Sequence, residues 1–370
     1  MLRSLDLFAG IGGITRALRG LAEPVAYCEC EPTRIATLKN LMKKGCIPDA
    51  PIHNDICTFD GSAYMDIDLV CGGWPCRGWS VVGKHEGFQH AHSALFFEFA
   101  RIVRHIRPPF IFQENVPAVL AETPMHHITT ALEDYDLVWM TLPAYAVGAL
   151  HNRLRWYCLG IRKDIVKKTI APRDPYVRHS FDPTMPRLTH VRTPIARLSM
   201  LGNAVVPDAV RLAFTMLFTG FSIPPADLWT ATTYEFKRPE RTGHPLGKDP
   251  VKRRYGSYID GTFQRHTLPP DTIPARPDLG LSLVPYSYVT TATPKAPEHH
   301  ILKTNRHRSL WASPRGANLG ASGVLTERSV RDLYTQLRFE KSTPEEERYG
   351  FPNPEWVEHL MGFPPTWTAY

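Results

Sequence analysis

Residues 5–13 read Leu5-Asp6-Leu7-Phe8-Ala9-Gly10-Ile11-Gly12-Gly13. An apolar run ends in a group of glycines, and Ile14, Leu18 and Leu21 follow at helical spacing. This pattern predicts a strand, a tight loop and a helix. The glycines let the backbone approach a ligand closely in front of a helix N-terminus, although a turn that serves only packing gives the same pattern.

A second predicted strand, residues 25–31, ends in acidic residues about 20 positions further along the chain. Glu29 in this segment suits bidentate hydrogen bonding to the two hydroxyls of a ribose. Asp55 follows a turn and is a candidate partner for an adenine amino group. Together the two segments predict a nucleoside cofactor without saying which one.

A third predicted strand, residues 67–71, runs into Gly72-Gly73-Trp74-Pro75-Cys76. The cysteine therefore follows the carboxyl end of a strand, where ligands bind in open α/β sheets. Cys76 is either a small buried hydrophobe or a nucleophile, and the loop alone does not decide between them.

Another segment delivers a carboxylate to the same edge. Apolar residues on one face predict a core helix over residues 95–106, and residues 110–112 read as a buried strand. Glu114 follows that strand, so it is expected at the sheet edge that carries Cys76.

Two further strands are predicted over residues 136–142 and 155–161. Arg153 and Arg155 lie before and at the start of the second of these strands. In an extended chain their side chains point to the same side.

Composition limits the class of protein. The chain has 370 residues, 43% of them hydrophobic, and no apolar run near the roughly 18 residues of a membrane helix. The seven cysteines lack the spacing of a disulfide framework or a zinc site, so no metal is expected. We therefore expect a soluble, intracellular protein.

The positive charge is concentrated in one region. The formal net charge is +7, and residues 237–315 hold 14 Lys and Arg against 6 Asp and Glu. This basic, proline-rich region suggests a polyanionic partner, although a solvated basic surface is the alternative.

Five segments, in this order, resemble the DNA (cytosine-5) methyltransferases: Asp6 to Gly13, Pro75-Cys76, Glu114-Asn115-Val116, Arg153-x-Arg155, and Leu201-Gly202-Asn203-Ala204-Val205-Val206-Pro207. The resemblance implies an α/β, Rossmann-like S-adenosylmethionine-dependent methyltransferase sheet with helices on both faces. It also implies a smaller, irregular target-recognition domain.

The order of the segments departs from the usual family arrangement. Residues 163–197 are too few for a recognition domain, whereas about 150 residues follow the Gly-Asn segment. Near the end of the chain, residues 353–364 resemble a supporting motif of bacterial and phage members. We therefore expect a catalytic domain over 1–220, a recognition domain over 221–345, and a segment over 346–370 that packs back on the catalytic domain.

The resemblance implies the chemistry of the site. Cys76 attacks cytosine C6, Glu114 contacts the N3 and amino edge, and Arg155 holds O2 with support from Arg153. The base must leave the duplex to be reached. His151 replaces a common glutamine, and histidine makes a similar hydrogen bond.

The implied cofactor is S-adenosyl-L-methionine, with S-adenosyl-L-homocysteine as the product. The residues that match its binding motifs are Asp6, Phe8, Ala9, Gly10, Gly12, Gly13, Glu29, Cys30, Asp55, Ile56, Pro75, Asn203 and Val205. Cys30 stands where many relatives carry a bulky residue against the adenine.

The expected partner is double-stranded DNA, with a cognate restriction endonuclease as a candidate, and we expect a monomer that contacts no membrane. The expected DNA contacts are Arg77, Ser80, Lys252, Arg253, Arg254, Arg306, Arg308 and Arg315, for which solvated loops are the alternative. The expected location is the cytoplasm of a bacterial or phage-infected cell.

Three other functions fit parts of the sequence: cytosine-5 methylation of RNA, an inactive DNA-binding regulator, and a nucleotide-dependent oxidoreductase. The oxidoreductase explains the glycine loop, but neither Pro75-Cys76 nor Glu114-Asn115-Val116.

Overall fold

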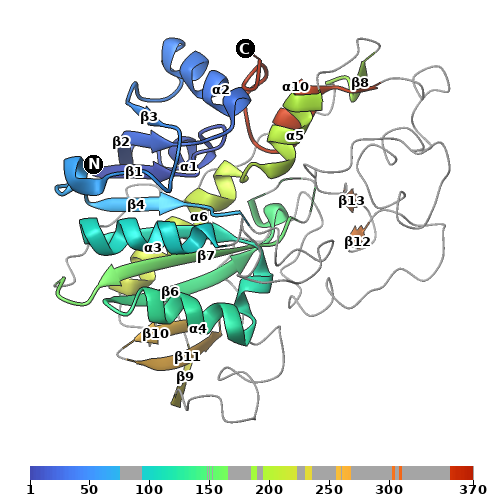
Figure 1. Ribbon diagram of the computed structural model, residues 1–370. Coiled ribbons are helices and arrows are strands. Elements are labelled where there is room, and N and C mark those ends of the chain that lie inside the picture. Colours follow the sequence, from blue (N-terminus) through green and yellow to red (C-terminus); the bar gives the residue numbers. More distant parts are fainter. Residues whose placement is uncertain are drawn as a thin grey trace.

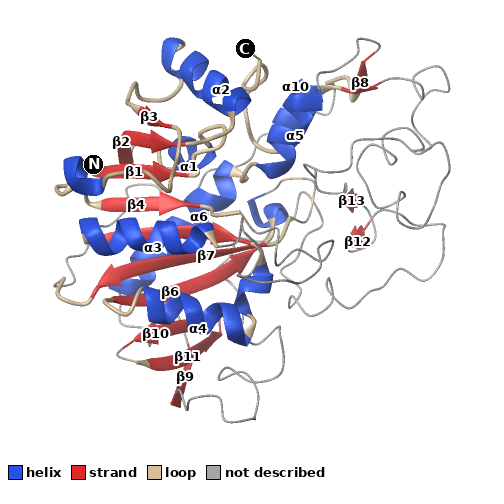
Figure 2. Ribbon diagram, in the orientation of Figure 1, coloured by secondary structure: helices blue, strands red, loops and turns tan. Residues whose placement is uncertain are grey.

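The computed structural model describes residues 1–75, 94–147, 149, 151, 153–165, 185–189, 195–222, 230–235, 256–259, 261–267, 302–304, 308–310 and 351–369. Its centre is a ten-stranded sheet with the strand order β3-β2-β1-β4-β5-β7-β6-β10-β11-β9 (Figure 1, Figure 2). In chain order the strands are β1 (Leu2–Leu7), β2 (Ala22–Cys28), β3 (Ile52–His53), β4 (Leu69–Gly72), β5 (Phe110–Asn115), β6 (Tyr135–Leu142), β7 (Arg155–Arg162), β9 (Thr230–Glu235), β10 (Gly256–Ile259) and β11 (Thr262–Thr267).

Within the catalytic part of the sheet, β7 runs opposite to its two neighbours. Strands β3, β2, β1, β4 and β5 pair in parallel, whereas β7 pairs antiparallel with both β5 and β6. As a result, the carboxyl ends of β4 and β5 and the amino end of β7 meet at one edge.

Helices cover both faces of the sheet, as the predicted fold class requires. In Figure 1, α3 (Leu95–Ile106) and α4 (Glu122–Ala131) lie in front of the sheet, and α6 (Pro207–Ser222) lies behind it. Two apolar clusters correspond to these layers: one contains α3 and α4, and the other contains α1 (Gly13–Ala17), α2 (Pro32–Lys43) and α6. Alternate strand residues feed the two clusters, because Leu69 packs into one and Val70 into the other.

The observed helices follow the expected positions with one clear difference. Helix α3 spans the predicted residues, whereas α1 ends at Ala17, before the predicted Leu21. Gly20, with a φ of 79°, turns the chain back towards β2.

Part of the range assigned to the recognition domain continues the catalytic sheet. Strand β10 pairs antiparallel with β6, and β11 and β9 follow it outward. Three strands from residues 230–267 thus extend the far edge of the sheet.

The C-terminal segment lies against the N-terminal half of the chain. Helix α10 (Pro354–Leu360) packs beside α5 (Ile195–Asn203), as Figure 1 shows. Asn353 caps α10 by accepting a hydrogen bond from the backbone N–H of Glu355. Before this helix, β14 (Phe351–Pro352) pairs with β8 (Leu188–Thr189).

A buried ion pair fixes this packing. Glu358 is fully buried, and its Oε1 accepts hydrogen bonds from Arg197 Nη2 at 2.9 Å and from the Thr368 backbone N–H at 2.8 Å. Arg197 Nε donates to the Thr368 hydroxyl at 3.0 Å. One carboxylate therefore joins α5, α10 and the end of the chain.

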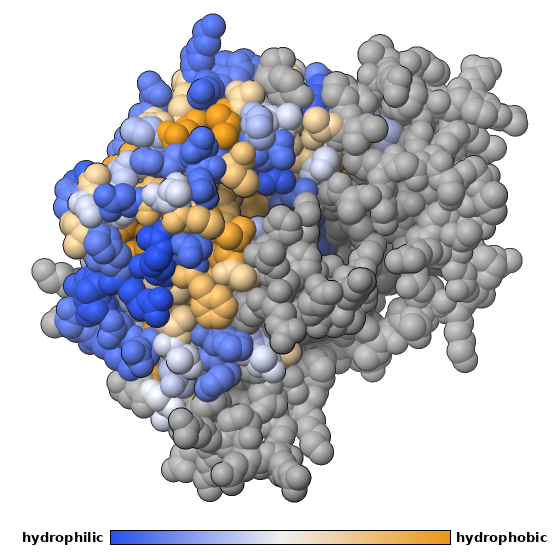
Figure 3. Space-filling model, viewed as in Figure 1, coloured by the Kyte–Doolittle hydropathy of each residue, from blue (hydrophilic) through white to orange (hydrophobic). Residues whose placement is uncertain are grey.

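One helical stretch, Ala196–Phe218, is long and apolar enough to span a membrane by length and composition. It comprises α5 and α6, which are separated by residues 204–206, and 67% of its most apolar window is buried inside the protein. Core helices of globular domains have the same properties. On the face in Figure 3, hydrophilic side chains dominate the described surface, and apolar ones gather towards the centre of the view.

We predict that Arg197→Met lowers the free energy of unfolding by about 3 kcal/mol, because it leaves the buried Glu358 carboxylate without its cation. Urea denaturation measures the loss. The control is Arg3→Met, which breaks a pair with Asp66 whose side chains are 53% and 66% exposed. We expect it to cost about 0–1 kcal/mol. Equal losses in the two variants would contradict the role of the buried pair.

Candidate active site

The glycine loop between β1 and α1 adopts an unusual backbone. Phe8, Gly10 and Gly12 have φ values of 56°, 59° and 74°, and two of these three positions are glycine, which adopts this region without strain. The Ala9 N–H donates to the Cys28 carbonyl at 2.9 Å, which ties the loop to the end of β2. A Cβ on Gly13 would lie 2.6 Å from Val205 Cγ2, so the segment after α5 presses directly on this loop.

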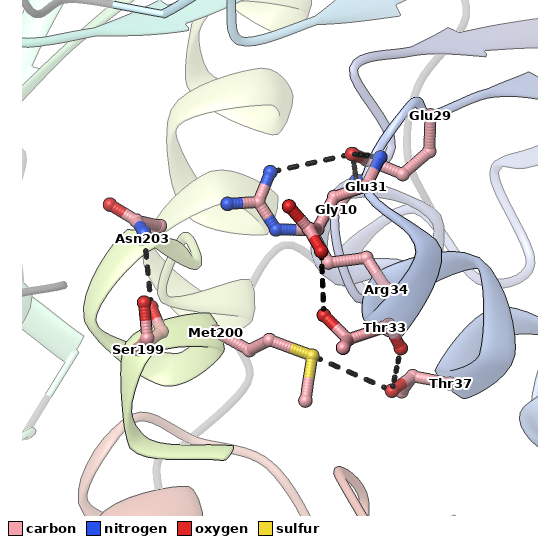
Figure 4. A network of polar contacts seen from close by, with 9 residues as sticks. All are labelled: Gly10, Glu29, Glu31, Thr33, Arg34, Thr37, Ser199, Met200 and Asn203. Carbon is pink, nitrogen blue, oxygen red and sulfur yellow. Dashed lines mark hydrogen bonds and ion pairs between the residues drawn. The ribbon is translucent and has the colours of Figure 1, made fainter. Parts of the chain in front are cut away.

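Glu29 holds the glycine loop from the β2 side. It is 4% exposed, and its Oε2 accepts from the Gly10 N–H at 2.8 Å while Oε1 accepts from the Glu31 N–H at 3.0 Å (Figure 4). Arg34 of α2 lies 3.4 Å from Oε1. The sequence pattern gave no role to Arg34, which lies five positions after Glu29.

The end of α5 forms the opposite wall. Figure 4 shows Asn203 and Ser199 across from Gly10 and Glu29, and Asn203 Nδ2 donates to the Ser199 carbonyl at 3.0 Å. Below them, the Thr37 hydroxyl lies 3.6 Å from Met200 Sδ, which joins α2 to α5. The structure thus brings the predicted residues of the first and last motifs together.

These residues fit an adenosyl cofactor. Among the described residues, a Cβ on Gly10 would meet the Phe8 carbonyl oxygen alone, at 3.9 Å, so this part of the chain leaves the loop open on that side. Each oxygen of the Glu29 carboxyl group has room for a further hydrogen bond besides that of the backbone N–H group. A ribose between Gly10 and Asn203 would meet this carboxylate.

Two residues predicted to contact the adenine, Asp55 and Ile56, follow β3, which pairs with the end of β2 that leads to Glu29. Ile56 is buried, and its carbonyl accepts from Arg101 Nη2 at 3.0 Å. Asp55 Oδ1 accepts from the Cys57 N–H at 2.9 Å, and Cys30 is exposed. Arg101 is a positioning residue that the sequence did not reveal, because its partners are backbone carbonyls 42 to 45 residues away.

Asp6 lies beneath the glycine loop as a buried acid. Its Oδ2 accepts from the Thr15 hydroxyl at 2.6 Å, and Oδ1 has no hydrogen-bond partner within the described residues. Burial raises the pKa of this carboxyl to about 7, although the bond from Thr15 opposes the shift. Through Thr15, Asp6 therefore joins β1 to α1, the two elements that the glycine loop connects.

Glu114 and Arg155 meet where β5 ends and β7 begins. Arg155 Nε lies 3.0 Å from Glu114 Oε1. Burial raises the pKa of Glu114, and the charges of Arg155 and Arg153 work against that rise. The pair combines a carboxyl that can carry a proton with a fixed cation beside it.

Asn115 connects this pair to the Pro-Cys loop. Its Nδ2 donates to the Trp74 carbonyl at 3.1 Å, and its Oδ1 accepts from the Val116 N–H at 2.8 Å. A Cβ on Gly73 would lie 2.9 Å from Glu114 Oε2. The backbone that leads into Pro75 therefore passes directly beside the Glu114 carboxylate, and Cys76 itself lies outside the described residues.

Arg153 differs from the expectation of an extended chain. Its φ is 30°, and its Nη2 donates to the carbonyls of Gly202, at 3.1 Å, and Ala204. Arg153 thus ties the start of β7 to the end of α5, whereas Arg155 forms the ion pair with Glu114. His151 is buried and hydrogen-bonds through Nε2 to the Leu360 carbonyl at 3.1 Å.

Most of the predicted DNA contacts lie outside the described residues: Arg77, Ser80, Lys252, Arg253, Arg254, Arg306 and Arg315. Arg308 begins β13 (Arg308–Leu310), which pairs antiparallel with β12 (Leu302–Thr304). These DNA contacts stay predictions.

Comparison with known proteins agrees with this geometry. Residues 2–200 match the model of the family described as C-5 cytosine-specific DNA methylase. The type II methyltransferase M.CviJI of Paramecium bursaria Chlorella virus IL3A is 30% identical over 357 residues, which cover 91% of this chain and 90% of that protein. The chain belongs to the C-5 cytosine-specific DNA methylase family. It is a DNA (cytosine-5) methyltransferase.

Two further relatives match over shorter stretches. The type II methyltransferase M.HhaI of Haemophilus parahaemolyticus is 31% identical over 49% of this chain and 55% of its own length. The solved S. pombe Dnmt2 methyltransferase is 22% identical, with a TM-score of 0.37 over 46% of this chain and 52% of that one. The relatives include viral, phage and bacterial proteins.

We predict that Asp6→Asn gains stability over the wild type as the pH rises from about 4 to about 7. A raised pKa means that the folded protein keeps a proton that the unfolded chain has lost, so wild-type stability falls across this window. Above pH 7 we expect this gain to reach about 4 kcal/mol. Urea denaturation at pH 4 to 8 measures it. The exposed substitution Asp66→Asn should show no such trend, and a flat difference for Asp6→Asn would contradict the prediction.

Proposed function

We propose that this protein transfers a methyl group to C5 of a cytosine flipped out of duplex DNA at a specific sequence, with Cys76 as the nucleophile. The observation that carries the proposal is the Glu114–Arg155 pair beside the backbone that leads into Pro75. The DNA-methylase family favours this substrate over RNA.

Covalent attack is needed because cytosine C5 is a poor nucleophile. Cys76 adds to C6 as a thiolate, and negative charge develops towards N3 as the C–S bond forms. Glu114 donates a proton to N3, and Arg155 stabilises charge at O2. After methylation, loss of the C5 proton and expulsion of Cys76 restore the aromatic ring and the free thiol.

Burial suits Glu114 to this step. A raised pKa keeps a larger fraction of the carboxyl protonated at neutral pH, which the donation to N3 requires. Arg155 limits the rise, so the same group can return to the carboxylate when the charge moves to the base. Arg153 supports the site indirectly, through the carbonyls of Gly202 and Ala204.

S-adenosyl-L-methionine supplies the methyl group and leaves as S-adenosyl-L-homocysteine. Glu29 and Gly10 would hold its ribose and backbone, and Asp55 and Ile56 would flank its adenine. Asn203 and Val205 would close the pocket from the α5 side. The remaining residues assigned to this pocket are Asp6, Phe8, Ala9, Gly12, Gly13, Cys30 and Pro75.

We assign DNA recognition to the basic region between strands β9–β11 and the C-terminal segment. Residues 230–267 add strands to the catalytic sheet, so the reading of bases is assigned to residues 268–345 of the predicted range 221–345. Lysines and arginines in this region would neutralise phosphates. A cognate endonuclease is a candidate partner, by analogy with the type II relatives.

The proposed nucleophile predicts a covalent adduct with duplex DNA that contains 5-fluorocytosine, in the presence of S-adenosylmethionine. Fluorine at C5 cannot leave as a proton does, so the enzyme stalls while it is bound through Cys76. The adduct is measured as a shifted band on a denaturing gel. Cys76→Ser should form none, and the matched variant Cys46→Ser, at a position far from the site in sequence, should still form it.

An adduct with Cys76→Ser would overturn the assignment of the nucleophile. An adduct with RNA but not with duplex DNA of mixed sequence would overturn the substrate. Bisulfite sequencing of methylated DNA then locates the recognised sequence.

We predict that Glu114→Gln lowers kcat by about 100-fold or more, because the amide keeps the shape of the side chain but cannot donate the proton to N3. Wild-type kcat should fall as the pH rises above the raised pKa of Glu114, and the variant should lack this limb. Single-turnover methylation of duplex DNA measures both effects. The control Glu23→Gln, at an exposed position at the start of β2, should leave kcat unchanged within about twofold. Loss of activity in Glu23→Gln to the same degree would contradict the assignment.

A further inference from the structure

Two side chains from distant parts of the chain hold adjacent residues of the glycine loop. The Glu29 carboxylate accepts from the Gly10 N–H at 2.8 Å, and Trp367 Nε1 donates to the Ile11 carbonyl at 2.8 Å. Glu29 reaches the loop from β2, whereas Trp367 reaches it from the C-terminal segment, 356 positions away. The loop is therefore held at two consecutive residues by two independent side chains.

The environment of Trp367 is built to keep its indole in place. The ring is 3% exposed, Arg16 lies over it at 5.1 Å from the centroid, and Phe363 packs beside it at 5.5 Å between ring centroids. Asn40 Nδ2 donates to the Ala369 carbonyl at 2.7 Å, which fixes the chain just after Trp367. Thr368, next to it, is bound by the buried Glu358.

The loop needs such support because of its sequence. Glycines at positions 10, 12 and 13 have the largest backbone freedom to lose, and Phe8 adopts a positive φ that costs a non-glycine residue free energy. The helix that follows contributes little, since α1 has five residues and Gly12 supplies no side-chain cap. A loop of this kind keeps one conformation only when its surroundings hold it there.

We propose that Trp367 is a positioning residue for cofactor binding, which holds the Ile11 carbonyl so that the glycine loop is already formed when S-adenosylmethionine arrives. The inference rests on the proposed cofactor and extends it to the C-terminal segment. Without the indole N–H, binding of the cofactor must also order the loop. The apparent Kd then equals the intrinsic Kd divided by the fraction of molecules in which the loop is already formed.

The test is Trp367→Phe, which keeps an aromatic ring in the core and removes only the donor and part of the ring. Titration calorimetry with S-adenosylhomocysteine should show a Kd about three- to tenfold above that of the wild type. Hydrogen exchange at the amides of residues 10–13 should be faster than in the wild type, with the exchange of β4 and β5 unchanged. The KM for S-adenosylmethionine should rise while kcat at saturating cofactor and DNA stays within about twofold.

Trp156→Phe is the matched control. This tryptophan is fully buried on β7 in the other apolar cluster, and its Nε1 has no hydrogen-bond partner within the described residues. Trp156→Phe removes the same part of the ring but breaks no hydrogen bond within the described residues. The Kd for S-adenosylhomocysteine should therefore stay at the wild-type value. If Trp367→Phe does not fold, Asn40→Ala loosens the same segment from a half-buried position and should raise the Kd about twofold.

The outcomes separate this inference from the proposed function. A wild-type protein that does not bind S-adenosylhomocysteine overturns the proposed cofactor, and the inference with it. Wild-type binding with an equal Kd in Trp367→Phe overturns the inference alone. An equal rise in Trp156→Phe also overturns it, because the loss of ring packing would then explain the effect.

Discussion

Strand β5 pairs in parallel with β4 on one side and antiparallel with β7 on the other, and the site depends on this change of direction. In an all-parallel sheet, the start of the neighbouring strand would lie at the opposite edge from the end of β5. Here the register places Asn115, the last residue of β5, opposite Trp156. Arg155, the first residue of β7, therefore lies at the same edge of the sheet as Glu114. The ion pair and the entry to the Pro-Cys loop thus share one edge.

The buried acids of the domain are stabilised in different ways, according to what surrounds them. Glu358 receives a cation and the donors of Thr368, so it serves as a structural junction. Glu114 has Arg155 as its cation, yet burial still raises its pKa, which leaves it able to carry a proton. Asp6 accepts from the Thr15 hydroxyl, and burial raises its pKa to about 7. Burial thus shifts Asp6 and Glu114 towards the protonated form, whereas Glu358 joins three segments of the chain.

Local patterns in the sequence predicted the elements that position the site. Short-range periodicity predicts the strand before Gly72, helix 95–106 and the strand before Glu114. Each of them buries an apolar face that can be recognised from the spacing of its apolar residues. The prediction of an extended chain at Arg153 was wrong, because its φ is 30° and its bonds to Gly202 and Ala204 depend on a contact about fifty residues away. The pairing of β10 with β6 and the bond from Trp367 to Ile11 are longer-range still. No local pattern encodes them.

The rearranged order of the segments has a structural consequence. Helices α5 and α6 pack against α1 and the middle of the sheet before the chain enters the basic region. That region then adds Phe263 of β11 to the apolar cluster that contains α3 and α4. The chain then returns through α10, and its last residues contact α2, α5 and the glycine loop. Strand β14 and helix α10 thus bring the end of the chain back onto the described core. The same return carries the Trp367 indole to the Ile11 carbonyl, so the glycine loop and the C-terminal segment form one packed unit.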